Sequence, residues 1–182
     1  MLTVSDISRL DPDDIDALLP LARSAFIATY SDHNPADIMA EYISTAFTRQ
    51  QFSREMQDPN NLFLGIHEQG DLAGFVKLRS GPVPADVSLL PAIEIERIYT
   101  RAGHTGRGIG RKLMDAAVAA ATERHYKAVW LGVWQQNHRA VAFYEREGFR
   151  IVGTKVFMMG SDAQTDHIMV RSINGSEQPS QQ

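Results

Sequence analysis

The spacing of apolar residues changes along the chain, and each change predicts a different kind of element. Apolar residues recur at helical spacing over 14–30 and again over 35–56, which predicts two amphipathic helices. Pro20 lies inside the first helix, and the second is expected to divide near Thr48. Residues 3–8 alternate between apolar and polar, so a short strand is predicted ahead of the helices.

From residue 62 the period falls to two, which is typical of strands. Two alternating segments, 62–67 and 71–79, flank a Glu-Gln-Gly turn and predict a hairpin. Further strands are predicted over 92–100, 128–134, 150–158 and 165–173, and further helices over 108–125 and 137–147. This order predicts one α/β domain over 1–173, with a mixed sheet of about seven strands and helices on both faces. The polar residues 174–182 are expected to form a disordered tail.

The composition limits the chemistry that the chain can perform. The formal net charge of −4 argues against binding to nucleic acid. Apolar runs are shorter than the ~18 residues of a membrane span, and the N-terminus does not resemble a signal peptide. We therefore expect a cytoplasmic protein that binds no membrane. The absence of cysteine excludes disulfides and a cysteine nucleophile, and the histidines lack metal-ligand spacing, so no metal site is expected.

Three glycines, Gly106, Gly108 and Gly110, stand between a predicted strand and a predicted helix. Backbone N–H groups in such a turn can converge on an anion, and the helix dipole adds partial positive charge. Arg107 and Arg111 would reinforce this potential. The turn lacks the Gly-Lys-Ser/Thr ending of a P-loop. The pattern predicts an anion site of another kind, with a glycine turn that holds no ligand as the alternative.

The stretch ERIYTRAGHTGRGIGRKL at 96–113 resembles the acyl-CoA signature of the GNAT superfamily of N-acetyltransferases. The later NHRAVAFYEREGF at 137–149 is similar to the second cofactor segment of that family. The resemblance implies the GNAT fold, with the sheet splayed at the strand that holds acetyl-CoA. It also implies acetyl-CoA as cosubstrate and a small amine as acceptor. One position departs from the family pattern, since its Gln or Arg falls on Thr105.

The resemblance further implies where the cosubstrate binds. The pantetheine arm would pair with the strand at 98–100, and the pyrophosphate would meet the glycine turn. The implied residues are Ile98, Tyr99, Thr100, Gly106, Arg107, Gly108, Ile109, Gly110, Arg111, Asn137 and Tyr144. Because the arm acts as an added strand, we expect a β-bulge near 97–99. Asn137 is also a candidate N-cap.

Three residues are candidates for catalysis. By similarity to the family's tyrosine, Tyr144 would protonate the departing thiolate; a half-buried aromatic residue is the alternative. Glu94 and Glu96 are two apart in a strand, so they are expected to share one face with Ile98 and Thr100. There they could attract a cationic amine and accept its proton, whereas a solvated strand face is the alternative. Without cysteine, direct attack by the amine in a ternary complex is the expected mechanism.

Four phrases, IERIYT, WLGVWQQN, AFYEREGF and GSDAQTDHIMVR, resemble the bacterial PaiA-type spermidine/spermine N-acetyltransferases. This resemblance implies a polyamine acceptor. Asp162, Asp166 and His167 in the last phrase are expected between the final strands, in a substrate loop or a solvated turn. Trp130 and Trp134 share a strand face and are expected in the core or in a dimer contact, with an ammonium-binding cage as the alternative, which leaves a homodimer open. A protein, peptide or aminoglycoside acceptor and a non-catalytic acyl-CoA-binding regulatory module are the alternatives.

Overall fold

The computed structural model describes residues 7–104 and 106–173. In chain order its elements are β1 (Ile7–Arg9), η1 (Pro12–Asp14), α1 (Ile15–Tyr30), η2 (Ser31–His33), α2 (Ala36–Ala46), α3 (Arg49–Gln57), β2 (Asn61–Glu68), β3 (Asp71–Arg79), β4 (Ala92–Thr100), α4 (Ile109–Glu123), β5 (Ala128–Trp134), α5 (His138–Arg146), β6 (Arg150–Met159) and β7 (Asp162–Ser172). Thr105 and the predicted tail at 174–182 lie outside the described residues, as do positions 3–6 of the first predicted strand.

The helices of the first third form as the apolar periodicity predicts. α1 continues through Pro20 without a restart. The second predicted helix divides into α2 and α3 at Thr48, whose side chain caps α3 by accepting a hydrogen bond of 3.1 Å from the Gln51 N–H. The cap explains the division, because a threonine oxygen that satisfies a free N–H group favours a new helix start over continuation.

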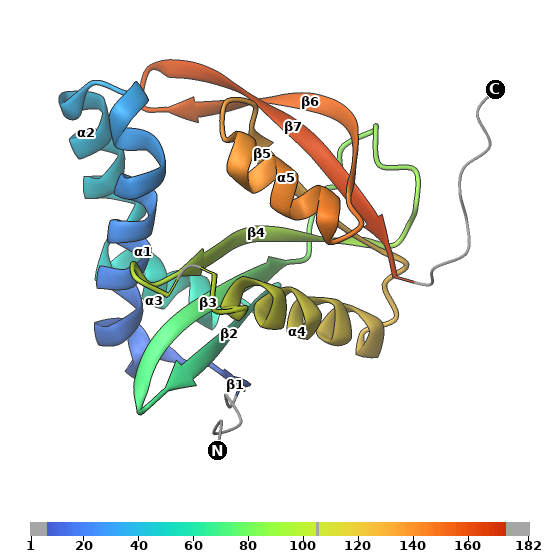
Figure 1. Cartoon of the computed structure of the whole chain (residues 1–182), viewed down its shortest axis with the longest axis horizontal. Coiled ribbons are helices and arrows are strands. Elements are labelled where there is room, and N and C mark those ends of the chain that lie inside the picture. Colours follow the sequence, from blue (N-terminus) through green and yellow to red (C-terminus); the bar gives the residue numbers. More distant parts are fainter. Residues whose placement is uncertain (1–6, 105, 174–182) are drawn as a thin grey trace.

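One seven-stranded sheet runs through the molecule in the order β1-β2-β3-β4-β5-β7-β6 (Figure 1). The central neighbours β4 and β5 are parallel, and every other neighbouring pair is antiparallel. β4 and β5 pair over three positions, Ala92 to Glu94 against Ala128 to Trp130. Beyond these positions the strands have no paired residues, so the sheet opens toward their C-terminal ends. The predicted mixed sheet with a splay at β4 is confirmed.

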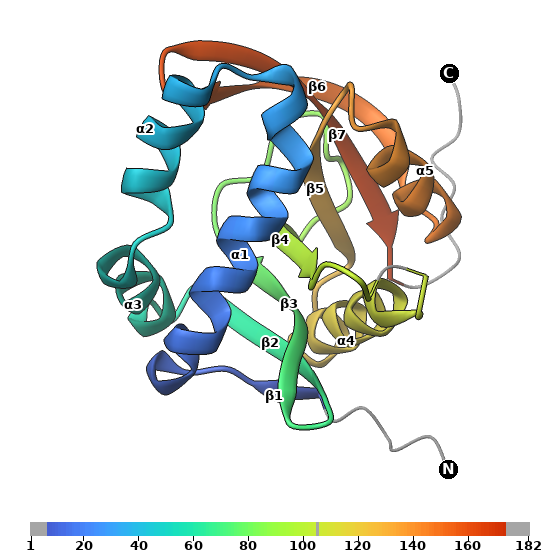
Figure 2. The ribbon, with the colours of Figure 1, turned by 60° about the vertical axis from the view of Figure 1, so that its left-hand side comes forward.

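Helices cover both faces of the sheet (Figure 2). α4 and α5 pack on one face, against apolar side chains that include Val76 and Ile98. α1, α2 and α3 pack on the other face, against Phe63, Phe75 and Tyr99. Because successive side chains of a strand point to opposite faces, each strand contributes to both cores. The predicted α/β layering is thereby confirmed.

β4 carries its bulge at Glu96. Lys77 of β3 lies opposite Arg97, while the next residue, Leu78, lies opposite Ile95, so Glu96 is the extra residue. The bulge therefore starts one position before the predicted range of 97–99.

The bulge reverses the alternation of side chains that follow it. Glu94 and Glu96 both face the side of α1, whereas Ile98 and Thr100 face α4. The expectation that all four residues share one face is wrong, because that expectation assumed an unbroken strand. An extra residue shifts every later side chain to the opposite face.

The C-terminal hairpin is longer than the sequence pattern predicts. β7 begins at Asp162, so Asp162, Asp166 and His167 are strand residues rather than parts of a loop. Cross-strand pairing runs without interruption from Met159 opposite Asp162 to Gly153 opposite Ile168. The prediction of a substrate loop at this position is therefore wrong. β7 begins with polar residues, which are common in turns as well as in strands, so the sequence pattern does not mark its start.

Candidate active site

The backbone of β4 has an unpaired edge inside the sheet. From Ile95 to Thr100 it pairs with β3 on one side and has no strand partner on the side of β5. Unpaired N–H and C=O groups of a strand edge can bind an extended chain. Ile98, Tyr99 and Thr100 lie on this edge, as the prediction of an arm-binding strand requires.

The edge leads directly into the glycine turn and α4. Gly103, Gly106 and Gly108 have φ values of 81°, 83° and 79°, in the left-handed region that disfavours other residues. A Cβ atom at any of the three would meet nothing within 4 Å, so the turn presents bare backbone to open space. Within the described residues no side chain caps α4, whose first N–H groups lack intrahelical partners. A negatively charged group would satisfy them.

Gly110 and the two arginines of the turn have other surroundings. Gly110 lies beside the ring of Phe143, where an added Cβ atom would make an ordinary van der Waals contact at 3.5 Å. Arg107 is about half exposed, and its Nη1 lies 3.4 Å from Glu68 Oε2 in the β2–β3 hairpin. Arg111 is exposed on α4. Both arginines remain at the surface beside the turn, where they can reach an anion by side-chain rotation.

α5 supplies two of the predicted residues. Asn137 is its N-cap, because the side-chain oxygen accepts a hydrogen bond of 3.1 Å from the Ala140 N–H. Tyr144 packs between Phe143 and Phe149, with ring centroids 5.3 and 5.8 Å away. Burial and then the nearby Tyr99 raise the pKa of Tyr144. The phenol therefore keeps its proton at neutral pH. It also lies close enough to Tyr99 of β4 to interact with it electrostatically.

On the face toward α1, the two predicted carboxylates are held by cations. Arg79 Nη2 lies 2.6 Å from Glu94 Oε2, and Lys155 Nζ lies 3.8 Å from Glu94 Oε1. Glu96 forms ion pairs with Lys77 and, at 3.3 Å, with Arg79. Of the two carboxylates, Glu94 is the more buried, with 5% of its side chain exposed against 22% for Glu96.

Glu55 of α3 completes this network and was not a candidate from the sequence. Its carboxylate lies 2.8 Å from Lys77 Nζ and 2.6 Å from Arg97 Nη1. Burial alone would raise the pKa of Glu55, but Arg97 and then Lys77 outweigh it and lower the pKa to about 2. The sequence holds one signal of the network, since Lys77 and Arg79 alternate on a strand that precedes Glu94 and Glu96. The position of Glu55 in the network depends on how α3 packs on the sheet, which the sequence pattern does not show.

Each carboxylate of the network contacts two cations. Glu55, Glu94 and Glu96 face four cationic side chains from β3, β4 and β6, namely Lys77, Arg79, Arg97 and Lys155. Surrounding cations therefore offset the charge of the two predicted carboxylates, whose part in the reaction stays a prediction. Attraction of a cationic amine by Glu94 and Glu96 alone is not favoured by this arrangement.

Comparison with known proteins assigns the family. The model of the acetyltransferase (GNAT) family matches residues 16–149, which include β4, the glycine turn and α5. The chain belongs to the GNAT acetyltransferase family. It is therefore an N-acetyltransferase, and acetyl-CoA is the typical cosubstrate of its family.

Three individual matches agree with this family. An uncharacterized N-acetyltransferase of Lactobacillus delbrueckii subsp. lactis, from the pepI 3′ region, is 27% identical over 172 residues, 94% of this chain and 99% of that protein. Spermidine N(1)-acetyltransferase of Thermoplasma acidophilum is 24% identical, over 82% of this chain and 90% of that protein. The crystal structure of PaiA N-acetyltransferase from Thermoplasma acidophilum, in complex with coenzyme A, has a TM-score of 0.77 at 24% identity. That match covers 93% of this chain and 99% of the other and supports the GNAT fold.

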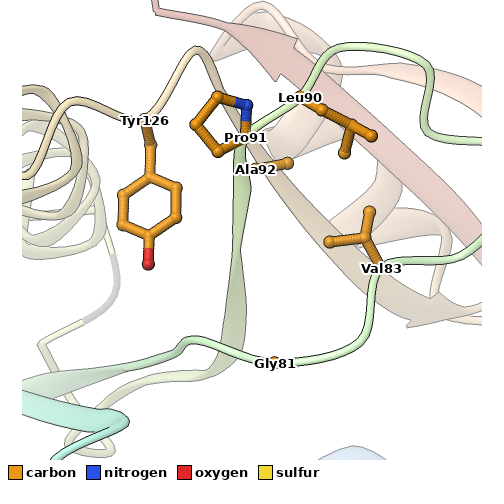
Figure 3. A pocket seen from close by; sticks show the side chains of 6 residues that line it. All are labelled: Gly81, Val83, Leu90, Pro91, Ala92 and Tyr126. Atoms are coloured by element: carbon orange, nitrogen blue, oxygen red, sulfur yellow. The ribbon is translucent and has the colours of Figure 1, made fainter.

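A surface pocket of about 470 Å³ lies away from the GNAT site (Figure 3). It is lined by Gly81, Val83, Leu90, Pro91, Ala92 and Tyr126. Ala92 begins β4, so the pocket lies at the opposite end of that strand from the glycine turn. It adjoins the closed end of the splay, where β4 and β5 still pair, and we assign it no role in catalysis.

The two tryptophans of β5 are core residues, with 4% of Trp130 and 7% of Trp134 exposed. Trp130 packs under Lys155, whose Nζ lies 5.4 Å from the ring centroid. Trp134 contacts Tyr30 and His33, with ring centroids 5.5 and 5.2 Å away. The core alternative for both residues is confirmed. No helix of the described segments is long and apolar enough to span a membrane.

Glu55→Gln is expected to destabilise the protein by about 3 kcal/mol at pH 7, because it leaves Lys77 and Arg97 without their buried carboxylate. A carboxyl group whose pKa is lowered on folding stabilises the protein above its unfolded pKa, and this contribution is lost as the pH falls through the folded value. The difference between wild type and variant should therefore shrink from about pH 4.5 toward pH 2. Urea unfolding at several pH values measures it. Glu145→Gln, an exposed change on α5, is the control, and equal stability of Glu55→Gln and wild type at pH 7 would contradict the account.

Proposed function

We propose that this acetyltransferase transfers the acetyl group of acetyl-CoA to a primary amine, with a polyamine such as spermidine as preferred acceptor. The single observation that carries the proposal is the unpaired edge of β4, which runs from Ile95 to Thr100 and ends at the glycine turn. It would offer an extended arm its backbone partners, and the turn from Gly106 to Arg111, where Gly108 gives α4 no side-chain cap, would offer backbone N–H groups to a pyrophosphate. Few other ligands combine an amide-bearing arm with a pyrophosphate.

The reaction proposed is direct attack by the amine. The nitrogen lone pair bonds to the thioester carbon, the carbon–sulfur bond breaks, and the thiolate takes a proton. A backbone N–H group near Ile98 would polarise the thioester carbonyl during this step. The chain contains no cysteine to form an acyl intermediate, which favours a ternary complex of both substrates. Asn137 is proposed to contact the cosubstrate as well as cap α5.

Tyr144 is the proposed donor of the proton to the leaving thiolate. Its hydroxyl group stays protonated because burial raises its pKa. A free thiol has a pKa of about 8.5, so a thiolate expelled at neutral pH needs a hydrogen-bond donor at once. The packing of Tyr144 between Phe143 and Phe149 fixes the ring and so supports this role.

Glu96 is the proposed acceptor of the amine's proton, directly or through water. It is the more exposed of the two candidates, and its pairing with Lys77 and Arg79 keeps the side chain on the α1 face. Glu94 would support it through their shared partner Arg79. The pH dependence of kcat/KM in Glu96→Gln tests the assignment, because an unaltered acidic limb would move it to Glu94 or to water.

The polyamine preference is supported by the match to spermidine N(1)-acetyltransferase of Thermoplasma acidophilum and by the formal net charge of −4. A negative protein attracts a polycation over a distance, which increases the rate of encounter. An aliphatic monoamine carries a single positive charge and would be attracted less strongly. A protein, peptide or aminoglycoside amine is the alternative acceptor.

Tyr144→Phe should lower kcat about 10- to 1,000-fold, because the thiolate loses its hydrogen-bond donor in the transition state. The affinity for acetyl-CoA should change by less than about threefold, since the ring and its packing remain. Steady-state rates and a titration of acetyl-CoA measure both quantities. Phe143→Leu, a change in the neighbouring ring, controls for packing, and an unchanged kcat in Tyr144→Phe would make Tyr144 a packing residue only.

The proposed function is tested by an assay of CoA release with spermidine, spermine, a lysine peptide, an N-terminal peptide and an aminoglycoside. We expect the highest kcat/KM with a polyamine. A higher value for another acceptor would reassign the preference, while no release above the spontaneous rate with any amine would support a non-catalytic acyl-CoA-binding module. Acetyl-CoA at about 100 times its Kd should also stabilise the protein by about 2.7 kcal/mol, and no shift in Tm would overturn the cosubstrate assignment.

A further inference from the structure

Asp166 of β7 is a buried carboxylate that the proposed reaction does not use. Its residue is 7% exposed, and its Oδ1 has no hydrogen-bond partner within the part of the chain that the structure describes. A buried polar atom without a partner is costly, and native proteins keep few of them. Asp166 Oδ1 therefore needs a hydrogen-bond partner that the described residues do not supply.

The neighbours of Asp166 come from the open end of the splay. Asp166 lies opposite Trp134 of β5 on one side and opposite Lys155 of β6 on the other. Because β5 has no β4 partner beyond Trp130, the Trp134 end of the strand belongs to the opening itself. The ring of Trp134 contacts Tyr30, so Asp166 is next to an aromatic wall at this opening.

Gly132 makes room for the Lys155 side chain beside the carboxylate. This residue lies between Trp130 and Trp134 on the same strand face. A Cβ atom there would lie 3.2 Å from Asp166 Oδ2 and only 2.3 Å from Lys155 Cε. A larger residue would therefore displace Lys155 and crowd the carboxylate, so the glycine lets the Lys155 side chain lie next to Asp166.

The nearest cation does not satisfy Asp166. Lys155 directs its Nζ to Glu94, at 3.8 Å, and over the ring of Trp130. On this face Glu55, Glu94 and Glu96 each contact two cations. Among the described residues Asp166 forms no ion pair. It is therefore the carboxylate that remains able to recognise an added cation.

We propose that Asp166 binds the ammonium group of the acceptor amine, with Trp134 and Tyr30 as the aromatic walls of its site. The proposal rests on the proposed function, since it names the group that selects a cationic acceptor for the same reaction. A carboxylate gives the ammonium a charge-assisted hydrogen bond, and aromatic rings favour a cation through their faces. Asp166 is a binding residue here, and the proton transfer stays with Glu96 or water.

The electrostatics of the site agree with this assignment. Burial raises the pKa of Asp166 to about 6, and Lys155 and His167 oppose that rise. Tyr30 and Tyr42 also interact with Asp166, and both have a raised pKa and hence are neutral near pH 7. Glu94 faces the site through Lys155, and His33 packs against Trp134. An aliphatic amine, with a pKa of about 10.4, stays charged from pH 5 to 8, so loss of binding below pH 6 would report the carboxylate.

Asp166→Asn tests the proposal, with spermidine as the probe. KM for spermidine should rise roughly 10- to 100-fold, the effect of losing a hydrogen bond to a charged group, while KM for acetyl-CoA changes less than about twofold. Asp115→Asn, on the exposed surface of α4, removes the same charge elsewhere and should leave both values unchanged. An unchanged KM for spermidine in Asp166→Asn, or an equal rise for both substrates, would overturn the proposal.

A stability measurement separates binding from a structural role. Since the raised pKa means that the ionised carboxylate destabilises the folded state, stability is lost as the pH rises from about 4 through 6. Asn does not titrate, so the Tm of Asp166→Asn at pH 7.5 should equal or exceed that of wild type. A lower Tm together with an unchanged KM would assign Asp166 to folding alone.

The wild-type protein gives a test that needs no variant. Trp130 and Trp134 are the two tryptophans of the chain, and both border this site, so their fluorescence should report spermidine binding in the presence of CoA. The affinity for spermidine should fall about tenfold from pH 7 to 5 while that for CoA stays level. A level spermidine affinity would overturn the proposal. If no amine is acetylated by wild type, the proposed function fails instead, which keeps the two failures distinct.

Discussion

The early parting of β4 and β5 is the constraint on which the rest of the structure depends. Three residue pairs join these strands, and after Glu94 and Trp130 they separate. Backbone groups inside a sheet must otherwise be paired, so the separation leaves donors and acceptors that a ligand can use. The bulge at Glu96 lies at the start of this opening and changes which side chains of β4 point to each face.

The two faces of the opening serve different purposes. Toward α4 and α5 lie the glycine turn, Asn137 and Tyr144, which are suited to a phosphate-bearing cosubstrate and its leaving group. Toward α1 lies the network of Glu55, Glu94 and Glu96 with four cations. That network fixes β3, β4 and α3 to one another, and breaking a buried pair of this kind costs several kcal/mol. The charges of this network mainly stabilise the folded structure.

The order of elements and the glycine turn could be predicted because each depends on local sequence. Helical and strand periodicity, the cap at Thr48 and the left-handed glycines are properties of short segments. The bulge was predicted one residue too late, because its exact position follows from how β4 meets β3. For the same reason Ile98 and Thr100 were assigned to the wrong face. The ion partners of Glu94 and Glu96 depend on the packing of α3 and β6, which no short segment specifies. The predicted loop failed at Asp162, because polar residues there extend β7 in register with β6 ahead of the predicted strand at 165–173.

Backbone amide hydrogen exchange with and without acetyl-CoA tests the central claim most directly. Under conditions in which acetyl-CoA raises the Tm, peptides that cover 95–111 should exchange more slowly, because the unpaired edge of β4 and the N–H groups of the turn gain partners. Peptides that cover β6 should change little and serve as the internal control. Unchanged exchange over 95–111 while the Tm rises would place the cosubstrate elsewhere and contradict the account.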